Sequence, residues 1–124
     1  PYAGTPCYIC TRQQAQDGPD VRFTQLPPRQ LLQAIWAEHP GSVWLMGGGK
    51  TIRSFLDEDL IDEYIIYVQP VLLGGGIPLF PAGFPKTAVT LKSCQRIGDI
   101  VELIYQRAGG PQGKIDCIPG ETVV

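Results

Sequence analysis

Residues 43–46, Val-Trp-Leu-Met, run without a break into three glycines, and a helical pattern opens directly behind them. The four apolar residues predict a short strand that is buried on both faces, as strands of parallel or mixed sheets are. Ile52, Phe55 and Leu56 then recur at the i, i+3, i+4 spacing of a helix. Because glycine has no Cβ, the backbone of such a turn can approach a ligand closely, and the first helical amides face that ligand. The pattern predicts an anion site, with a nucleotide diphosphate as its preferred occupant.

The glycines match neither of the two best-known phosphate-binding motifs. A Walker A loop ahead of Gly49 and Lys50 would need glycine at position 44, which is Trp44. The Rossmann fingerprint would need glycine as its sixth residue, which is Ile52. The alternative interpretation is a tight strand-to-helix turn without a ligand, although each glycine costs chain entropy, about 0.5–1 kcal/mol relative to alanine.

The composition is that of one ordinary globular domain. The chain has 124 residues and a net charge of −2, and no face is evidently basic, so nucleic acid is not an expected partner. No apolar run reaches the roughly 18 residues of a membrane span, and residues 1–4 do not resemble a signal peptide. The chain begins with proline rather than methionine, which is typical of a processed product or a fragment. We expect a cytoplasmic protein without a membrane partner.

Four cysteines and one histidine are the candidates for a metal site. Cys7 and Cys10 have the spacing of half a zinc site, but in a predicted strand residues three apart point to opposite faces. No second pair follows, and His39 lies at a predicted helix end, whereas a tetrahedral site needs four ligands. We therefore expect no metal and predict reduced thiols, as is usual in the cytoplasm.

Periodicity predicts an α/β domain with the order β-β-α-β-α-β-β-β. The predicted strands cover residues 7–11, 21–24, 43–46, 63–69, 88–94 and 100–106, and the predicted helices cover 29–38 and the segment from the glycines to about residue 59. Gly98 and Asp99 lie between the last two strands, which predicts a hairpin. Residues 108–124 are rich in glycine and proline, so we expect a loosely structured tail behind a domain at residues 1–107.

Three motifs in order resemble a known family. They are residues 46–52 (Met-Gly-Gly-Gly-Lys-Thr-Ile), residues 60–64 (Leu-Ile-Asp-Glu-Tyr) and residues 70–80 (Pro-Val-Leu-Leu-Gly-Gly-Gly-Ile-Pro-Leu-Phe). Over about residues 4–107 the chain resembles the C-terminal reductase domain of the bacterial bifunctional riboflavin-biosynthesis deaminase-reductases. The resemblance implies a dihydrofolate reductase-like mixed sheet flanked by helices, truncated at its N-terminus relative to the family.

The resemblance also implies an NADPH-dependent oxidoreductase that transfers a hydride to a pterin, a pyrimidine or a related heterocycle, such as 5-amino-6-(5-phosphoribosylamino)uracil. The cofactor-binding residues that it implies are Thr11, Arg12, Gly47, Gly48, Gly49, Lys50, Thr51 and Ile52. The glycine turn would lie against the pyrophosphate, and Arg12 would meet the 2′-phosphate, for which a guanidinium fork is suited. A solvated charge at a strand end is the equal alternative for Arg12. Residues 72–76 would lie near the nicotinamide or the substrate, with an ordinary loop as the alternative.

No residue stands out as a general acid, and we assign no catalytic residue. Asp62 and Glu63 are adjacent carboxylates at the entrance of a predicted strand, but a solvated surface pair is the preferred interpretation.

The family's sheet has two further strands, one on each side of strand 43–46, for which this chain shows no counterpart. Without them strand 43–46 would lack partners on both edges. The strands could re-pair within the chain, or a separate N-terminal fragment could supply the edge, but we expect a homo-oligomer in which a second copy completes the sheet. The alternative function is a non-catalytic, truncated cofactor-binding or oligomerisation module. Its support is the missing segment, the free cysteines and the apolar residues Ile118, Val123 and Val124, which could pack on a partner.

Overall fold

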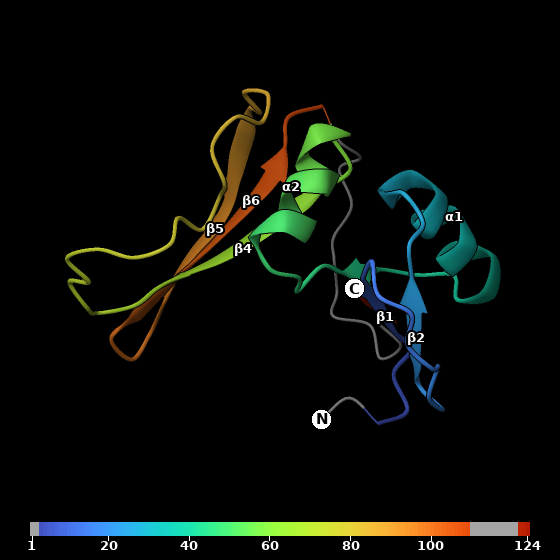
Figure 1. Cartoon of the computed structure of the whole chain (residues 1–124). Coiled ribbons are helices and arrows are strands. Elements are labelled where there is room, and N and C mark those ends of the chain that lie inside the picture. Colours follow the sequence, from blue (N-terminus) through green and yellow to red (C-terminus); the bar gives the residue numbers. More distant parts are fainter. Residues whose placement is uncertain (1–2, 110–121) are drawn as a thin grey trace.

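The computed structural model describes residues 3–109 and 122–124 (Figure 1). The strands are β1 (Cys7–Cys10), β2 (Val21–Thr24), β3 (Val43–Trp44), β4 (Glu63–Val68), β5 (Val89–Ile97), β6 (Ile100–Arg107) and β7 (Thr122–Val123), and the helices are α1 (Pro28–Glu38) and α2 (Gly49–Asp57). Every predicted strand and helix is present in the predicted order, although β3 is shorter than expected. The one element that the sequence did not predict is β7.

The strands form one parallel and one antiparallel sheet. The parallel sheet has the order β2-β1-β7-β3, and the antiparallel sheet has the order β4-β6-β5. Helix α1 connects the parallel strands β2 and β3, and α2 then leads from β3 to β4 in the other sheet. The mixed α/β architecture confirms the predicted fold class, with β3 and β4 each at the edge of its own sheet.

The hydrophobic core lies where the two helices meet the parallel sheet. Helix α1 begins at Pro28, which is tolerated there because the first-turn amides have no intrahelical acceptor. The buried members of the core cluster are Tyr8 of β1, Leu31, Leu32 and Ile35 of α1, Phe55 of α2, and Val124. Ile35 is fully inaccessible to solvent, and Leu31 is nearly so. This core packs both helices against the parallel sheet.

Strand β7 comes from the far end of the chain and lies in the middle of the parallel sheet, between β1 and β3. The ladder continues beyond its two residues. The amide of Val124 donates to the carbonyl of Trp44 (2.9 Å), and the amide of Met46 donates to the carbonyl of Val124 (2.8 Å). The Val124 side chain is 8% exposed and packs in the core.

Strand β7 corrects three expectations about the tail. Residues 122–124 are not loosely held, because they are hydrogen-bonded in the sheet. Strand β3 does not lack partners on both edges, since β7 fills one of them within the same chain. Val124 packs in its own chain rather than on a partner. The rest of the predicted tail, residues 110–121 with Ile118, lies outside the described residues, and the domain division stays a prediction there.

The antiparallel sheet contains the predicted hairpin between β5 and β6, and Gly98 in its turn has a φ of 62° that favours glycine. Arg107 of β6 ties this sheet to the end of α2, donating to the carboxylates of Asp59 (2.9 Å) and Asp62 (3.0 Å). Glu63 pairs instead with Lys92 at 3.1 Å, and its side chain is only 13% exposed. The expectation of solvated surface carboxylates is therefore wrong for Glu63 and confirmed for Asp62, whose side chain is 59% exposed although it pairs with Arg107.

Candidate functional site

The glycine turn joins β3 to α2 as predicted, and it presents a helix N-terminus without a side-chain cap. Gly48 is the N-cap residue, and the first turn of α2 contains no acidic residue. The amides of Thr51 (2.9 Å) and Ile52 (3.1 Å) donate to the carbonyl of Gly48. The amides of Gly49 and Lys50 come before the first amide that donates within the helix, so no intrahelical carbonyl pairs with them and they remain available to an anion.

The three glycines have different structural reasons to lack a side chain. A Cβ on Gly47 would lie 2.7 Å from the Cβ of Thr51, and a Cβ on Gly49 would lie 3.3 Å from Pro81, so packing within the chain accounts for both. A Cβ on Gly48 would meet nothing within 4 Å. Gly48 also has a negative φ of −66°, which any residue can adopt. Internal packing therefore does not explain Gly48, whereas the close approach of a ligand would.

Thr11 and Arg12 directly follow β1, at the same edge of the parallel sheet as the glycine turn. In a parallel sheet the carboxyl ends of all strands lie at one edge, and β1 and β3 are separated by β7 alone. At a strand spacing of about 4.8 Å, the two segments lie roughly 10 Å apart across that edge. Ligands of open α/β sheets bind at this edge, so the structure brings the predicted site residues to a suitable place.

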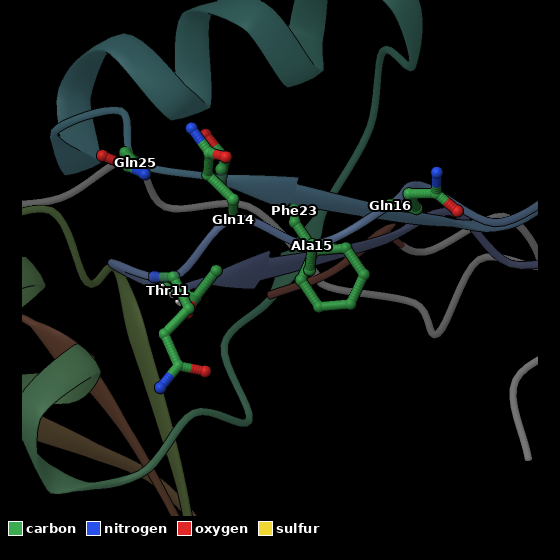
Figure 2. A pocket seen from close by; sticks show the side chains of 8 residues that line it. Thr11, Gln14, Ala15, Gln16, Phe23 and Gln25 are labelled. Carbon is green, nitrogen blue, oxygen red and sulfur yellow. Dashed lines mark hydrogen bonds between the residues drawn. The ribbon is translucent and has the colours of Figure 1, made fainter.

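A cavity of about 480 Å³ opens at the ends of β1 and β2. Its lining residues come from the loop between the two strands, from β2 and from the residue after β2, and Figure 2 shows them; they are Thr11, Gln13, Gln14, Ala15, Gln16, Phe23, Thr24 and Gln25. The backbone of Thr11 is fixed by a bond from its amide to the carbonyl of Thr24 (3.0 Å), and its hydroxyl accepts from the amide of Gln13 (3.1 Å). Four glutamines, one threonine pair and one aromatic ring make this a neutral, hydrogen-bonding cavity.

Arg12 is exposed and does not line this cavity, and within residues 3–109 and 122–124 it makes no ion pair. Thr11 and Arg12 therefore have separate roles in the structure, although they are adjacent. The four glutamines were missed by the sequence interpretation, which treated residues 13–20, with three of them, as a polar loop and gave Gln25 no role. The signal that could have revealed them is their position, directly behind a parallel strand.

The connection between β4 and β5 contributes to the glycine turn through its second half. Arg53 of α2 donates to the carbonyls of Ala82 (2.6 Å) and Gly83 (2.9 Å), and this anchors Pro81 beside Gly49. The first half of the connection behaves differently. Leu72 is fully exposed, and residues 72–76 do not line the cavity at Thr11; their place near the nicotinamide or the substrate stays a prediction.

Cys10 is the residue beside the candidate site whose pKa is shifted. Burial raises the pKa of the Cys10 thiol, which lies just before Thr11, so this thiol is protonated at neutral pH. Within the part of the chain that the structure describes, no three His, Cys, Asp or Glu side chains gather as a metal site would require. The glycine turn and the cavity thus offer backbone amides, amide side chains and hydroxyls, which can hydrogen-bond a polar or anionic ligand.

Comparison with known proteins decides the family. The model of the RibD C-terminal domain matches residues 5–103. The chain belongs to the RibD C-terminal domain family. The resemblance derived from the sequence motifs is thereby confirmed, together with the dihydrofolate reductase-like fold that it implied.

Relatives of known sequence and structure agree with this assignment. The chain is 36% identical to YwjB of Bacillus subtilis over 109 residues, 87% of this chain and 63% of that protein. It is 30% identical to the riboflavin biosynthesis protein RibD of Haemophilus influenzae over 88 residues, 65% of this chain and 23% of that protein. A putative riboflavin biosynthesis protein from Shewanella superposes with a TM-score of 0.74 at 25% identity, covering 84% of this chain and 61% of that one. RibD of Acinetobacter baumannii superposes with a TM-score of 0.63 at 27% identity, covering 72% and 27% respectively.

The chain thus spans less than two thirds of the length of each of these relatives. Within the described residues, neither helix has the length and apolar character needed to span a bilayer.

Proposed function

We propose that this RibD C-terminal family member is an NADPH-dependent reductase that transfers a hydride to a pterin, a pyrimidine or a related heterocycle. Its family supports a riboflavin-biosynthesis type of reductase. The observation that carries the proposal is the glycine turn, where Gly48 leaves open space above the unpaired first amides of α2. A side chain there would occupy the position of the pyrophosphate.

The chain's own residues would bind and orient the cofactor. The pyrophosphate would lie on residues 47–52, where the helix dipole and the amides of Gly49 and Lys50 favour an anion. The adenosine end would extend along the sheet edge to Thr11 and the neutral cavity beside it. Arg12, exposed at the rim, would meet the 2′-phosphate from solvent. When bound, the cofactor supplies the hydride, and the protein positions it and excludes water.

Assembly with a second copy of the chain is part of the proposal. Because β7 pairs with one edge of β3 within the chain, a second copy would not need to supply that edge. The substrate is a small heterocycle, and the protein acts in the cytoplasm without a nucleic-acid or membrane partner.

Binding and turnover measured together test the proposal. We expect NADPH to bind with micromolar or tighter affinity in calorimetry, and absorbance at 340 nm to fall when a heterocyclic substrate of the riboflavin pathway type is added. Binding without turnover for every pterin and pyrimidine tested would favour the alternative, a non-catalytic cofactor-binding module. Absence of NADPH binding would refute both.

A further inference from the structure

The glycine turn contains few contacts of its own that would hold its amides in place. Consecutive glycines lose more conformational freedom on ordering than other residues do. Helix α2 has neither a side-chain cap nor an acidic residue in its first turn. If the turn became ordered only when a ligand arrived, the cost of ordering it would be subtracted from the affinity. An anion site built on this turn therefore needs contacts from outside the turn.

Pro81, in the connection between β4 and β5, provides such a contact. A Cβ on Gly49 would lie 3.3 Å from the Cγ of Pro81, so the proline ring packs on the first residue of α2. The ring is rigid, because it fixes the φ angle of its own residue. Pro81 can thus restrict the movement of Gly49, whose amide is one of the two available to an anion, as long as Pro81 is itself held.

Arg53 holds the segment that contains Pro81. Its Nη1 donates to the carbonyl of Ala82 (2.6 Å), and its Nη2 donates to the carbonyl of Gly83 (2.9 Å). Its Nε donates to the carboxylate of Asp57 (2.7 Å), one helical turn further along α2. The planar guanidinium suits this fork, which binds two neighbouring carbonyls at once. Because each of the three nitrogens already has a partner within the chain, Arg53 would act on a bound anion through the backbone and not by direct contact.

Gly83 is matched to Arg53 in its conformation and in its size. Its φ is 93°, a value that residues with a side chain rarely adopt. A Cβ on Gly83 would lie 3.2 Å from Nη1 of Arg53, so a larger residue would press on the guanidinium. Glycine at this position therefore permits both the turn of the connection and the close approach of Arg53.

The same segment is held from its other side by aromatic packing. Phe80 packs edge-on against Tyr64 of β4, with ring centroids 6.1 Å apart, and against Phe84 at 6.3 Å. In the sequence, Pro81 lies between this aromatic contact and the carbonyls that Arg53 binds. Loss of the hydrogen bonds from Arg53 would therefore release one side of the segment and leave the aromatic side attached. A variant at Arg53 can thus remain folded while the glycine turn loosens.

We propose that Arg53 is a positioning residue of the anion site, which holds Pro81 against Gly49 and thereby pre-organises the amides of Gly49 and Lys50. The inference rests on the proposed function for its ligand, because the pyrophosphate of the cofactor is the anion in question. The positioning of the turn can nevertheless be measured without a ligand.

The test uses the full chain and a matched pair of arginine variants. Arg53→Lys keeps the charge, but a lysine ammonium cannot reproduce the planar fork on two carbonyls and a carboxylate. Arg96→Lys is the control, because the Nε of Arg96 also donates to a backbone carbonyl, that of Gly98 (2.6 Å), in the hairpin between β5 and β6. Circular dichroism verifies that both variants fold.

Amide hydrogen exchange measured by NMR tests the positioning without a ligand. The amides of Thr51 and Ile52 donate to the carbonyl of Gly48 and report on the first turn of α2. We expect both to exchange roughly five- to tenfold faster in Arg53→Lys, the effect of losing one or two hydrogen bonds, and at the wild-type rate in Arg96→Lys. The amide of Leu31 in α1 is the reference. An equal acceleration there would indicate general destabilisation and would overturn the proposal.

Ligand binding measures the consequence for the site. In calorimetry, NADPH should bind to Arg53→Lys with a dissociation constant roughly five- to tenfold higher than for the wild type, because the turn must then be ordered on binding. Adenosine 2′-phosphate should keep its wild-type dissociation constant, since it has the phosphate that Arg12 would meet but no pyrophosphate. A role of Arg53 in general stability would weaken both ligands equally, and that result would contradict a positioning role.

Pro81→Ala is the second variant; it removes the ring from Gly49 and leaves the hydrogen bonds of Arg53 in place. It should reproduce the faster exchange in the first turn. Because both changes act through one contact, the double variant should exchange no faster than the faster single variant. Additive effects, or wild-type exchange in either single variant, would overturn the proposal. If the wild type binds no NADPH, the proposed function fails, whereas the exchange rates still decide whether Arg53 positions the turn.

Discussion

Replacing Gly48 with valine is the most direct test of the anion site. The Gly48 backbone, with φ −66° and ψ 171°, lies in a region that valine adopts readily, and a Cβ there meets nothing within 4 Å. We therefore expect the variant to fold, with a stability loss within about 1 kcal/mol for the weaker helix N-cap. The new methyl groups would stand over the amides of Gly49 and Lys50, where the pyrophosphate is proposed to lie.

The expected loss of affinity follows from those two amides. A hydrogen bond to a charged group contributes about 1.5–3 kcal/mol, and the displacement of one such bond is a typical large single-site effect. We expect NADPH binding to weaken by about 1–3 kcal/mol, which is roughly 5- to 150-fold in the dissociation constant.

Calorimetry with NADPH measures this change, and thermal unfolding verifies that the protein remains folded. Gly18→Val is the matched control, because Gly18 has an ordinary Cβ environment, 3.9 Å from Val21, and does not line the cavity. If Gly48→Val binds NADPH as tightly as the control and the wild type do, the glycine turn is a structural turn without a ligand, and the proposed function loses its main support.

Three further predictions follow from the structure. Arg12→Ala should weaken NADPH binding and leave NADH binding nearly unchanged, since only NADPH carries the 2′-phosphate; equal losses in calorimetry would make Arg12 structural. Val124→Asp should lower the free energy of unfolding by about 2–4 kcal/mol in urea titrations, because it puts an unpaired charge into the core; an unchanged midpoint would contradict the observed packing of Val124. Because burial raises the pKa of Cys10, its alkylation by iodoacetamide, followed by peptide mass mapping, should accelerate only at a pH above that of an ordinary cysteine; reactivity at neutral pH equal to that of a model peptide would refute the assignment.

Elements whose apolar residues recur at a fixed spacing could be predicted from the sequence alone. The period of 3.6 in α1 and the alternation in β5 and β6 predicted those elements because each buries or exposes residues at a fixed spacing. Strand β7 could not be found in this way, because its two residues carry no period and its place depends on pairing with β1 and β3. The prediction that strand 43–46 lacks partners on both edges was wrong for the same reason, because it did not include β7.

The candidate site likewise has parts that could be predicted from the sequence and parts that could not. The turn at residues 47–49 was predictable because strand, glycines and helix are adjacent in sequence. The packing reasons for Gly47 and Gly49 were not, since Pro81 reaches Gly49 only through the bonds from Arg53 to the connection between β4 and β5. The cavity beside Thr11 likewise required the knowledge that β1 and β2 are parallel neighbours, which places residues 13–16 and Gln25 around one space.

Strand β7 and Val124, at the far end of the chain, also help to hold the glycine turn in place. The glycine turn begins at Gly47, and the residue before it, Met46, donates its amide to Val124. Strand β7 is the only strand neighbour of β3 among the described residues, so the position of the turn depends on a segment that lies at the far end of the chain. Val124 joins the same core cluster as Phe55 of α2, the helix whose first amides form the anion site. Val124 is therefore hydrogen-bonded to the backbone on one side of the turn and belongs to the core cluster that packs the helix on its other side, so the tail helps to set the geometry of the site.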